Sequence, residues 1–240
     1  MLVEVCANSL QSALNAEKGG ADRIELCSEL AVGGITPSYG LMKSIKKKLS
    51  IPVHVLIRPR SGDFSYSDEE FNIMKTNIEL CVELGFDGIV SGVLHEDFTL
   101  DKKRTKALIE LSGNLKFTFH RAFDWLENPM TALSYLETLG VDYILTSGQK
   151  KTALKGIELL TELHRKASRT TIMPGGGIRT DNIHLFQEAG FAVVHLSGTK
   201  LIRTLSSKPK VSMNSPSFLS DDELALTDTD TIHKIVNGVK

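Results

Sequence analysis

The stretch LGFDGIV, residues 84–90, follows a segment with helical periodicity and leads into a β-type run. The same order of residues recurs in GGADRIEL (19–26), LGVDYIL (139–145) and AGFAVVHL (189–196). In each copy a helix ends at a glycine, an apolar residue follows, and then a strand begins, usually after an aspartate. This repeat predicts a chain in which helices and strands alternate.

Eight β-type runs are spread along the chain, with helical stretches between them. They lie at 2–6, 23–27, 53–58, 87–91, 116–120, 142–146, 171–174 and 193–197. Eight strand–helix units in about 250 residues are typical of an α/β fold of the (β/α)8 TIM-barrel type, and an open doubly wound sheet is the alternative. We predict a single TIM-barrel domain over residues 1–240. A long connection at 204–228, rich in Ser, Pro and Asp, is expected before a last helix that starts near Thr229.

The composition is that of a soluble globular protein without a marked charge. The 240 residues are 41% hydrophobic and 24% charged, with a net charge of −1. This charge gives no reason to expect a nucleic acid or an anionic membrane as partner, and no apolar run approaches the ~20 residues that span a bilayer. The N-terminus lacks the features of a signal peptide. The three cysteines have no metal-finger spacing and favour a reducing, cytoplasmic setting.

Polar and apolar residues alternate along the predicted strands. Because the apolar set must pack against the helices, we expect the polar set to line the barrel interior. Barrel sites form at the carboxyl ends of strands. The inward residues at those ends are Cys6, Cys27, Arg58, His120 and Ser197. Glu4, Arg23 and His54 are expected deeper, where structural pairing is the main role; a self-contained network of Arg23 and Arg58 with Glu4 and Glu25 is the alternative to a functional site.

Glycine-rich turns follow the last two predicted strands. The stretch IMPGGGIRTDN (172–182) contains three successive glycines, and the eighth strand ends in LSGT. Loops after the seventh and eighth strands of a barrel often bind phosphate through main-chain N–H groups, although a tight turn alone would also require glycine. The anion-binding residues predicted on this basis are Gly175, Gly176, Gly177, Ser197 and Gly198.

Six blocks carry a resemblance to a known family. In chain order they are EVCANSLQSALNAEKGGADRIELCSEL, GGITPS, IPVHVLIRPRSGDF, TFHRAFD, LTSG and MPGGGI, all within residues 1–200. They resemble the CutC family of copper homeostasis proteins. The resemblance implies a cytoplasmic TIM-like barrel that forms homo-oligomers, binds Cu(I) and acts in copper tolerance, with Cys6 and Cys27 as the metal ligands. Some relatives have a cysteine near the end of strand eight, where this chain has HLSG.

The two cysteines are also informative without the family. Cys6 and Cys27 end neighbouring predicted strands in the same inward phase, and adjacent strands lie ~4.8 Å apart. Two thiolates so placed could hold a soft Cu(I) ion; buried thiols or a disulfide are the alternatives. Cys81 lies on the apolar stripe of a predicted helix and is expected in the core.

The alternative function is a TIM-barrel enzyme acting on a small phosphorylated or carboxylate substrate. Its catalytic residues would be Glu25, Arg58 and His120, which we expect to form one hydrogen-bonded cluster with Asp63 and Arg121 nearby. His120 could exchange protons near neutral pH, and the planar fork of Arg58 could bind an anion. A metal-dependent isomerase that uses Glu25 and His120 is a further alternative. The expected ligand is therefore a copper ion or a small anion.

Overall fold

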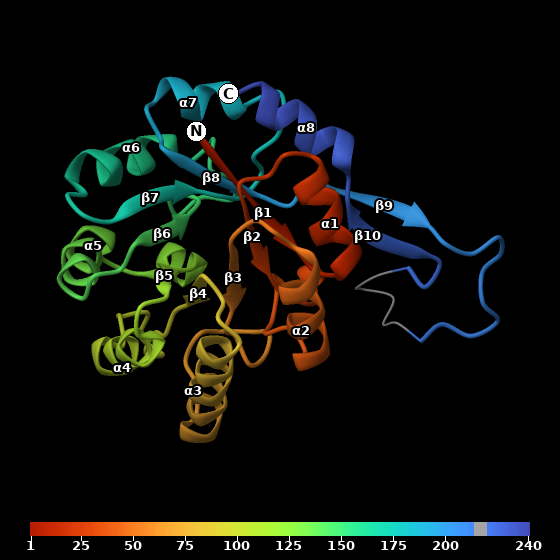
Figure 1. Ribbon diagram of the computed structural model, residues 1–240. Helices are drawn as coiled ribbons and strands as arrows, with labels where there is room; N and C mark the ends of the chain where they lie inside the picture. Colours follow the sequence, from red (N-terminus) through yellow and green to blue (C-terminus); the bar gives the residue numbers. More distant parts are fainter. Residues whose placement is uncertain (214–219) are drawn as a thin grey trace.

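The computed structural model describes residues 1–213 and 220–240. Eight parallel strands form one sheet that curves into a barrel (Figure 1). They are β1 (Leu2–Ala7), β2 (Arg23–Leu26), β3 (Val53–Leu56), β4 (Gly88–Ser91), β5 (Lys116–Phe119), β6 (Tyr143–Thr146), β7 (Thr171–Pro174) and β8 (Val193–Leu196). β1 pairs with β8, and a bridge between Gly175 and His195 joins β7 to β8. The predicted (β/α)8 barrel is confirmed, with strand ends shifted by one or two residues, and the open sheet is excluded.

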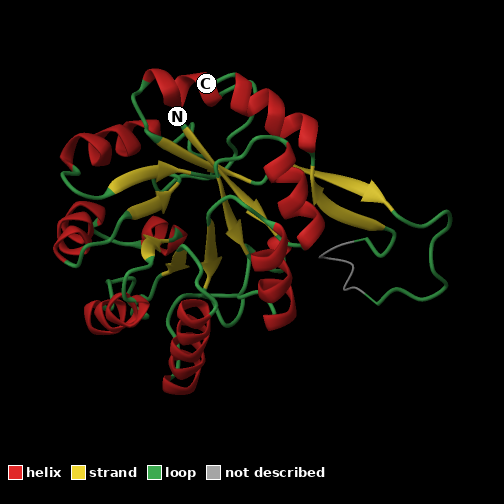
Figure 2. Cartoon of the chain, in the orientation of Figure 1, coloured by secondary structure: helices red, strands yellow, loops and turns green. Residues whose placement is uncertain are grey.

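Helices surround the strands on the outside (Figure 2). In the described part of the chain they are α1 (Leu10–Lys18), α2 (Tyr39–Lys48), α3 (Asp68–Glu83), α4 (Lys102–Ser112), α5 (Pro129–Thr138), α6 (Ile157–Lys166), α7 (Ile183–Glu188) and α8 (Thr229–Asn237), with 3-10 turns η1 (Leu30–Val32) and η2 (Arg121–Trp125). The last helix begins at Thr229, as predicted. No helix in 1–213 or 220–240 is both long and apolar enough to cross a membrane.

The repeated motif has a physical explanation at both of its defining residues. Its glycines follow α1, α3, α5 and α7 and adopt φ angles of 67° to 90°, a left-handed conformation that glycine adopts without strain. They are Gly20, Gly85, Gly140 and Gly190. Its aspartates accept the first free amide of the preceding strand at 2.8 Å. The pairs are Asp22 with Val3, Asp87 with Val53, and Asp142 with Phe117. The motif therefore ends a helix and ties two neighbouring strands together.

An antiparallel hairpin projects from the barrel between β8 and α8 (Figure 1). It consists of β9 (Thr199–Arg203) and β10 (Glu223–Thr227). The prediction that 204–228 is a connection is therefore wrong at its end, where Glu223–Thr227 form β10. Both strands are short and mostly exposed, so the sequence shows no clear alternation. Residues 214–219 lie outside the described residues.

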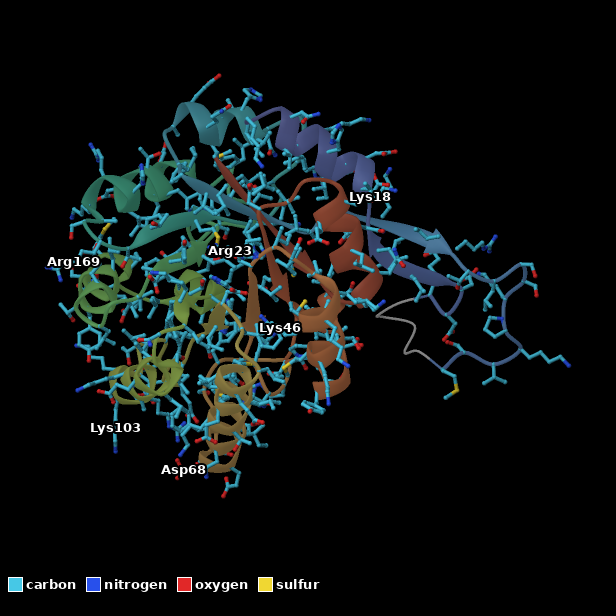
Figure 3. The ribbon with its side chains drawn as sticks, in the orientation of Figure 1. Lys18, Arg23, Lys46, Asp68, Lys103 and Arg169 are labelled. Carbon is cyan, nitrogen blue, oxygen red and sulfur yellow. The ribbon has the colours of Figure 1, made fainter. Side chains whose placement is uncertain are left out.

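The barrel interior is polar, as the alternation predicted. Glu4, Arg23, Glu25 and His54 are each at most 5% exposed, while most apolar side chains of the strands pack with those of the helices in the main core. A smaller apolar cluster of Leu145, Met173 and Val193 shares the interior with the polar residues. Figure 3 shows Arg23 near the centre of the barrel, whereas Lys103 and Arg169 lie at its periphery. Buried charge on this scale requires pairing, or a ligand, to offset its desolvation.

Candidate functional site

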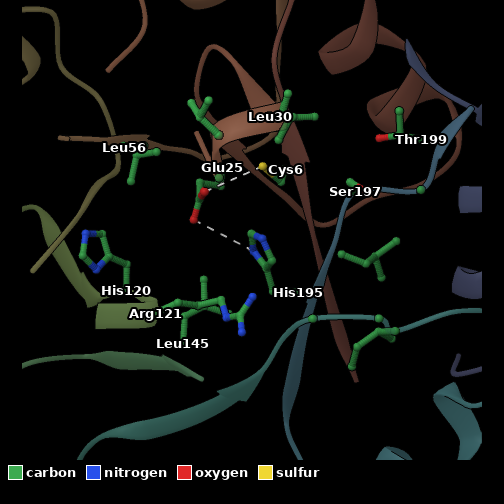
Figure 4. Close-up of a pocket in the computed structure, with 18 of the residues that line it drawn as sticks. Cys6, Glu25, Leu30, Leu56, His120, Arg121, Leu145, His195, Ser197 and Thr199 are labelled. Carbon is green, nitrogen blue, oxygen red and sulfur yellow. Dashed lines mark hydrogen bonds and ion pairs between the residues drawn. The ribbon is translucent and has the colours of Figure 1, made fainter. Parts of the chain in front are cut away.

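A cavity of about 1160 Å³ opens at the carboxyl ends of the barrel strands (Figure 4). Most of the residues predicted to form a site line it. They are Cys6, Glu25, Arg58, His120, Gly176, Gly177, Ser197 and Gly198. Cys27 and Gly175 are not part of its lining. The structure thus brings Cys6 and most of the residues predicted to bind an anion to one cavity.

The two cysteines meet at the end of β1 and just beyond β2. The Sγ atoms of Cys6 and Cys27 are 3.5 Å apart, so they are free thiols rather than a disulfide, whose sulfurs would lie about 2.05 Å apart. Cys6 is 7% exposed at the cavity wall, and Cys27 lies fully buried behind it. Leu30, Leu56 and Val90 pack around the pair and exclude water from it.

Ionisation of the Cys6 thiol is strongly unfavourable. Its hydrogen bond with Cys27, its burial and the nearby carboxyl of Glu25 raise the pKa of Cys6 well above the usual thiol value. Cys81 differs, because it packs in the main core on α3, where burial alone raises its pKa to about 12. The expectation that Cys81 is a core residue is confirmed.

A fully paired network lies at the floor of the cavity. Arg23 donates from Nε to Glu4 Oε2, and His195 Nδ1 lies 2.8 Å from Glu4 Oε1. Burial alone would raise the pKa of Glu4, but Arg23 and His195 outweigh it and lower the pKa to about 2. Burial alone would lower the pKa of His195, but Glu25, Cys6 and Glu4 raise it well above its usual value. The predicted structural pairing of Glu4 with Arg23 is confirmed, and it does not involve Arg58.

Glu25 lies one level higher and is poorly paired. Its Oε1 is 3.7 Å from Cys6 Sγ, while Oε2 has no hydrogen-bond partner among the described residues. Burial, with a further contribution from the charge of Glu4, raises the pKa of Glu25 to about 7. Together with His195, whose Nδ1 is 4.0 Å from Oε2, these residues form a group of potential metal ligands within 4.8 Å of one another. His195 was placed inward by the alternation but was not assigned to the site, because only the fold reveals its approach to Cys6 and Glu25.

Arg58 supports loops instead of presenting a free anion-binding fork. Its Nη1 donates to the carbonyls of Val32 and Gly34, and Nη2 donates to that of Gly62, at 2.7 to 2.9 Å. Its guanidinium also stacks over Phe64, 5.1 Å from the ring centre. The predicted hydrogen-bonded cluster of Glu25, Arg58 and His120 is therefore wrong, although all three line the same cavity. The carbonyls of two loops compete successfully for the guanidinium.

His120 is a neutral imidazole at the cavity wall. Its Nδ1 accepts from the amide of Ala122 at 3.2 Å, so the ring proton is on Nε2, which finds no acceptor in the described structure. Burial and the charge of Arg58 lower the pKa of His120 to about 3. The predicted proton-exchanging role near neutral pH does not fit this environment, whereas donation of a hydrogen bond does.

The glycine turns are only partly available to a ligand. The amide of Gly175 donates to the carbonyl of Thr146 at 3.0 Å, so this residue cannot contribute its N–H group. The amides of Gly177, Ser197 and Gly198 have no acceptor within 1–213 or 220–240. Asp63 is also unavailable to a ligand, because its carboxylate accepts hydrogen bonds from Arg60 and Ser65 away from the cavity.

Comparisons with known proteins agree with this fold. A model of the CutC family matches residues 1–200. A family protein CutC from Salmonella agona is 46% identical over 201 residues, which are 84% of this chain and 81% of that protein. One from Erwinia tasmaniensis is 40% identical over 237 residues, which are 98% and 94% of the two chains. A crystal structure of CutC from Streptococcus agalactiae, named for copper homeostasis, superposes with a TM-score of 0.77 at 35% identity and covers 81% of this chain and 97% of that one.

The matched region contains every strand of the barrel, together with Cys6 and Cys27. The chain therefore belongs to the CutC family.

Proposed function

We propose that this protein acts in copper homeostasis by binding Cu(I) through the thiolates of Cys6 and Cys27. The observation that carries the proposal is the 3.5 Å separation of the two sulfurs beside an open cavity. A metal–thiolate bond is about 2.3 Å long in zinc sites, so two sulfurs that share an ion lie at most about 4.6 Å apart. The pair can therefore hold one ion with little movement.

The chemistry of the surrounding residues fits a soft ion. Thiolates prefer Cu(I), whereas Mg²⁺ and Ca²⁺ require several oxygen ligands. The apolar side chains around the sulfurs keep water away from them. Glu25 Oε2, which is buried without a partner, and the imidazole of His195 lie close enough to Cys6 to supply a further ligand.

Binding should be coupled to proton release. Cys6 carries its proton in the free protein, because its hydrogen bond with Cys27 and its burial raise the pKa of Cys6. Cu(I) must displace this proton, so its apparent affinity should fall as the pH is lowered.

The test is an anaerobic Cu(I) titration against a competing chelator. We expect tight binding in the wild type and its loss in Cys6→Ser and Cys27→Ser. Cys81→Ser is the matched control, because it removes a buried thiol far from the cavity. Equal affinity in all four proteins would refute the proposal.

We also propose a cytoplasmic location and self-association. Three free thiols, two of them 3.5 Å apart, suit a reducing compartment. The hairpin exposes Leu201, Ile202 and Leu224, which a second copy of the chain could cover. Cell fractionation tests the location. Light scattering of the wild type and of Leu201→Asp tests the association, which a monomeric wild type would refute.

A further inference from the structure

The cavity is lined by several hydrogen-bond donors that the described residues leave unused. The amides of Gly177, Ser197 and Gly198 have no acceptor among the residues that the structure describes. The Nε2–H of His120, a side chain only 5% exposed, is likewise unpaired. The three amides are exposed or partly exposed, so an acceptor in the cavity can reach them, and the buried Nε2–H of His120 is costly without a partner. These donors in one cavity favour a ligand that accepts hydrogen bonds.

Arg121 adds a charged donor to the same cavity. Its Nε donates to Asp124 and its Nη2 donates to Ser147, both at 2.8 to 2.9 Å, while Nη1 has no acceptor in the described parts of the chain. A Cβ placed on Gly176 would lie 3.5 Å from this Nη1, so the bare backbone of the glycine turn faces the guanidinium. Figure 4 shows Arg121 at the cavity together with His120 and His195.

The charges of the lining favour an anion. The cavity is lined by three arginines and one lysine but by only two carboxylic acids, Glu25 and Asp124. The carboxylate of Asp124 already accepts from Arg121, Thr146 and Ser147 and does not compete for the remaining donors.

The size and the lining of the cavity indicate which kind of anion fits it. At about 1160 Å³ the cavity is far larger than a phosphate ion, and Leu30, Leu56 and Phe64 give part of its wall an apolar character. Three amides and a guanidinium match the several oxygens of a phosphoryl group better than the two oxygens of a carboxylate. Apolar surface beside such donors suits the organic part of an ester.

We propose that this cavity has a second site, which binds the phosphoryl group of a small phosphate monoester through Arg121 and the amides of Gly177, Ser197 and Gly198. The site does not depend on copper. Its ligand enters by the same mouth as the ion, so the two share the cavity but not their contacts.

The experiment is calorimetric titration of the metal-free protein with ethyl phosphate, inorganic phosphate and acetate. We expect ethyl phosphate to bind more tightly than inorganic phosphate, and acetate to bind far more weakly than both. Arg121→Gln should weaken ethyl phosphate binding about tenfold or more, the size expected for one charge-assisted hydrogen bond. Arg121→Lys should weaken it less, because it keeps the charge and loses only the fork.

Arg169→Gln is the matched control, since Arg169 is exposed on the periphery and should leave the affinity unchanged. The titration uses the metal-free protein, so its outcome does not depend on the copper proposal. The proposal is overturned if the wild type binds none of the phosphates, if acetate binds as well as they do, or if Arg121→Gln keeps the wild-type affinity.

Discussion

Glu4 and Glu25 are both buried inside the barrel on neighbouring strands, yet their surroundings have opposite effects. Glu4 is held between Arg23 and His195, and its pKa falls to about 2. Glu25 keeps an oxygen without a partner, and burial raises its pKa to about 7. The floor of the barrel has satisfied its charges internally, whereas the mouth has not. A buried carboxyl without a partner beside an open cavity is typical of functional sites, so this difference favours the binding site proposed at the mouth.

Removing Arg23 from the network at the floor of the barrel should have the largest effect on stability. We expect Arg23→Met to lower the free energy of unfolding at pH 7 by about 3–5 kcal/mol, because Glu4 would stay charged and lose its main partner. Urea denaturation measures this. Arg169→Met, at the exposed periphery, should change stability by no more than about 0.5 kcal/mol. A loss below about 1 kcal/mol for Arg23→Met would mean that His195 alone suffices for Glu4.

Removing the charge of Glu25 at the mouth should have the opposite effect on stability. The pKa of Glu25 is raised in the folded protein from 4.5 to about 7, so the wild type loses stability as the pH rises through this range. Glu25→Gln escapes the loss and should become more stable than the wild type by up to about 3 kcal/mol at pH 8, but not at pH 4. Unfolding curves across pH 4–8 test the trend.

Glu4→Gln is the counterpart of this experiment. The folded pKa of Glu4 is lowered to about 2, so its contribution is complete above pH 4.5 and is lost as the pH falls through 2. The variant should therefore be less stable than the wild type at pH 7, by an amount that shrinks in acid. Parallel pH trends in the two variants would contradict the difference between floor and mouth.

Arg58→Met tests whether Arg58 serves the loops or Glu25. Because the charge of Arg58 also lowers the pKa of His120, the comparison is made in a His120→Gln background. There the three carbonyl bonds of Arg58 predict a loss of about 1–3 kcal/mol that is the same at pH 5 and pH 8, because carbonyls do not titrate. If the loss instead grew as Glu25 ionised, Arg58 would be acting as its counter-ion. Thermal unfolding at the two pH values distinguishes these outcomes.

The smallest effect is expected at His120. His120→Gln removes one hydrogen bond from Ala122 and should cost about 1 kcal/mol at pH 8. The folded pKa is lowered from 6.5 to about 3, so the wild type loses stability below pH 6.5 while the variant does not. The difference should therefore shrink and change sign by pH 5. A constant difference would mean that the imidazole ionises freely in the folded protein.

Much of the fold was predictable because its signals are local. Glycines such as Gly85 end helices through their own φ angle, and alternation along a strand determines which side chains point inward. Because Cys6 and Cys27 point inward from neighbouring strand ends, their proximity was predicted correctly. The partners of Arg58 could not be predicted, because they are carbonyls of loops whose course depends on the whole fold. The hairpin was not predicted because β9 is exposed along most of its length and β10 is buried only at its end, so neither strand shows a regular pattern.

The bonds from Arg58 to Val32, Gly34 and Gly62 have a consequence for the kinetics of binding. They fix two loops of the cavity wall before any ligand arrives. A wall that is already ordered loses little conformational entropy on association and needs no closing step. We therefore expect stopped-flow traces with a single phase whose rate rises linearly with ligand concentration. In Arg58→Met, by contrast, a slower phase that saturates with concentration should appear as the loops become ordered.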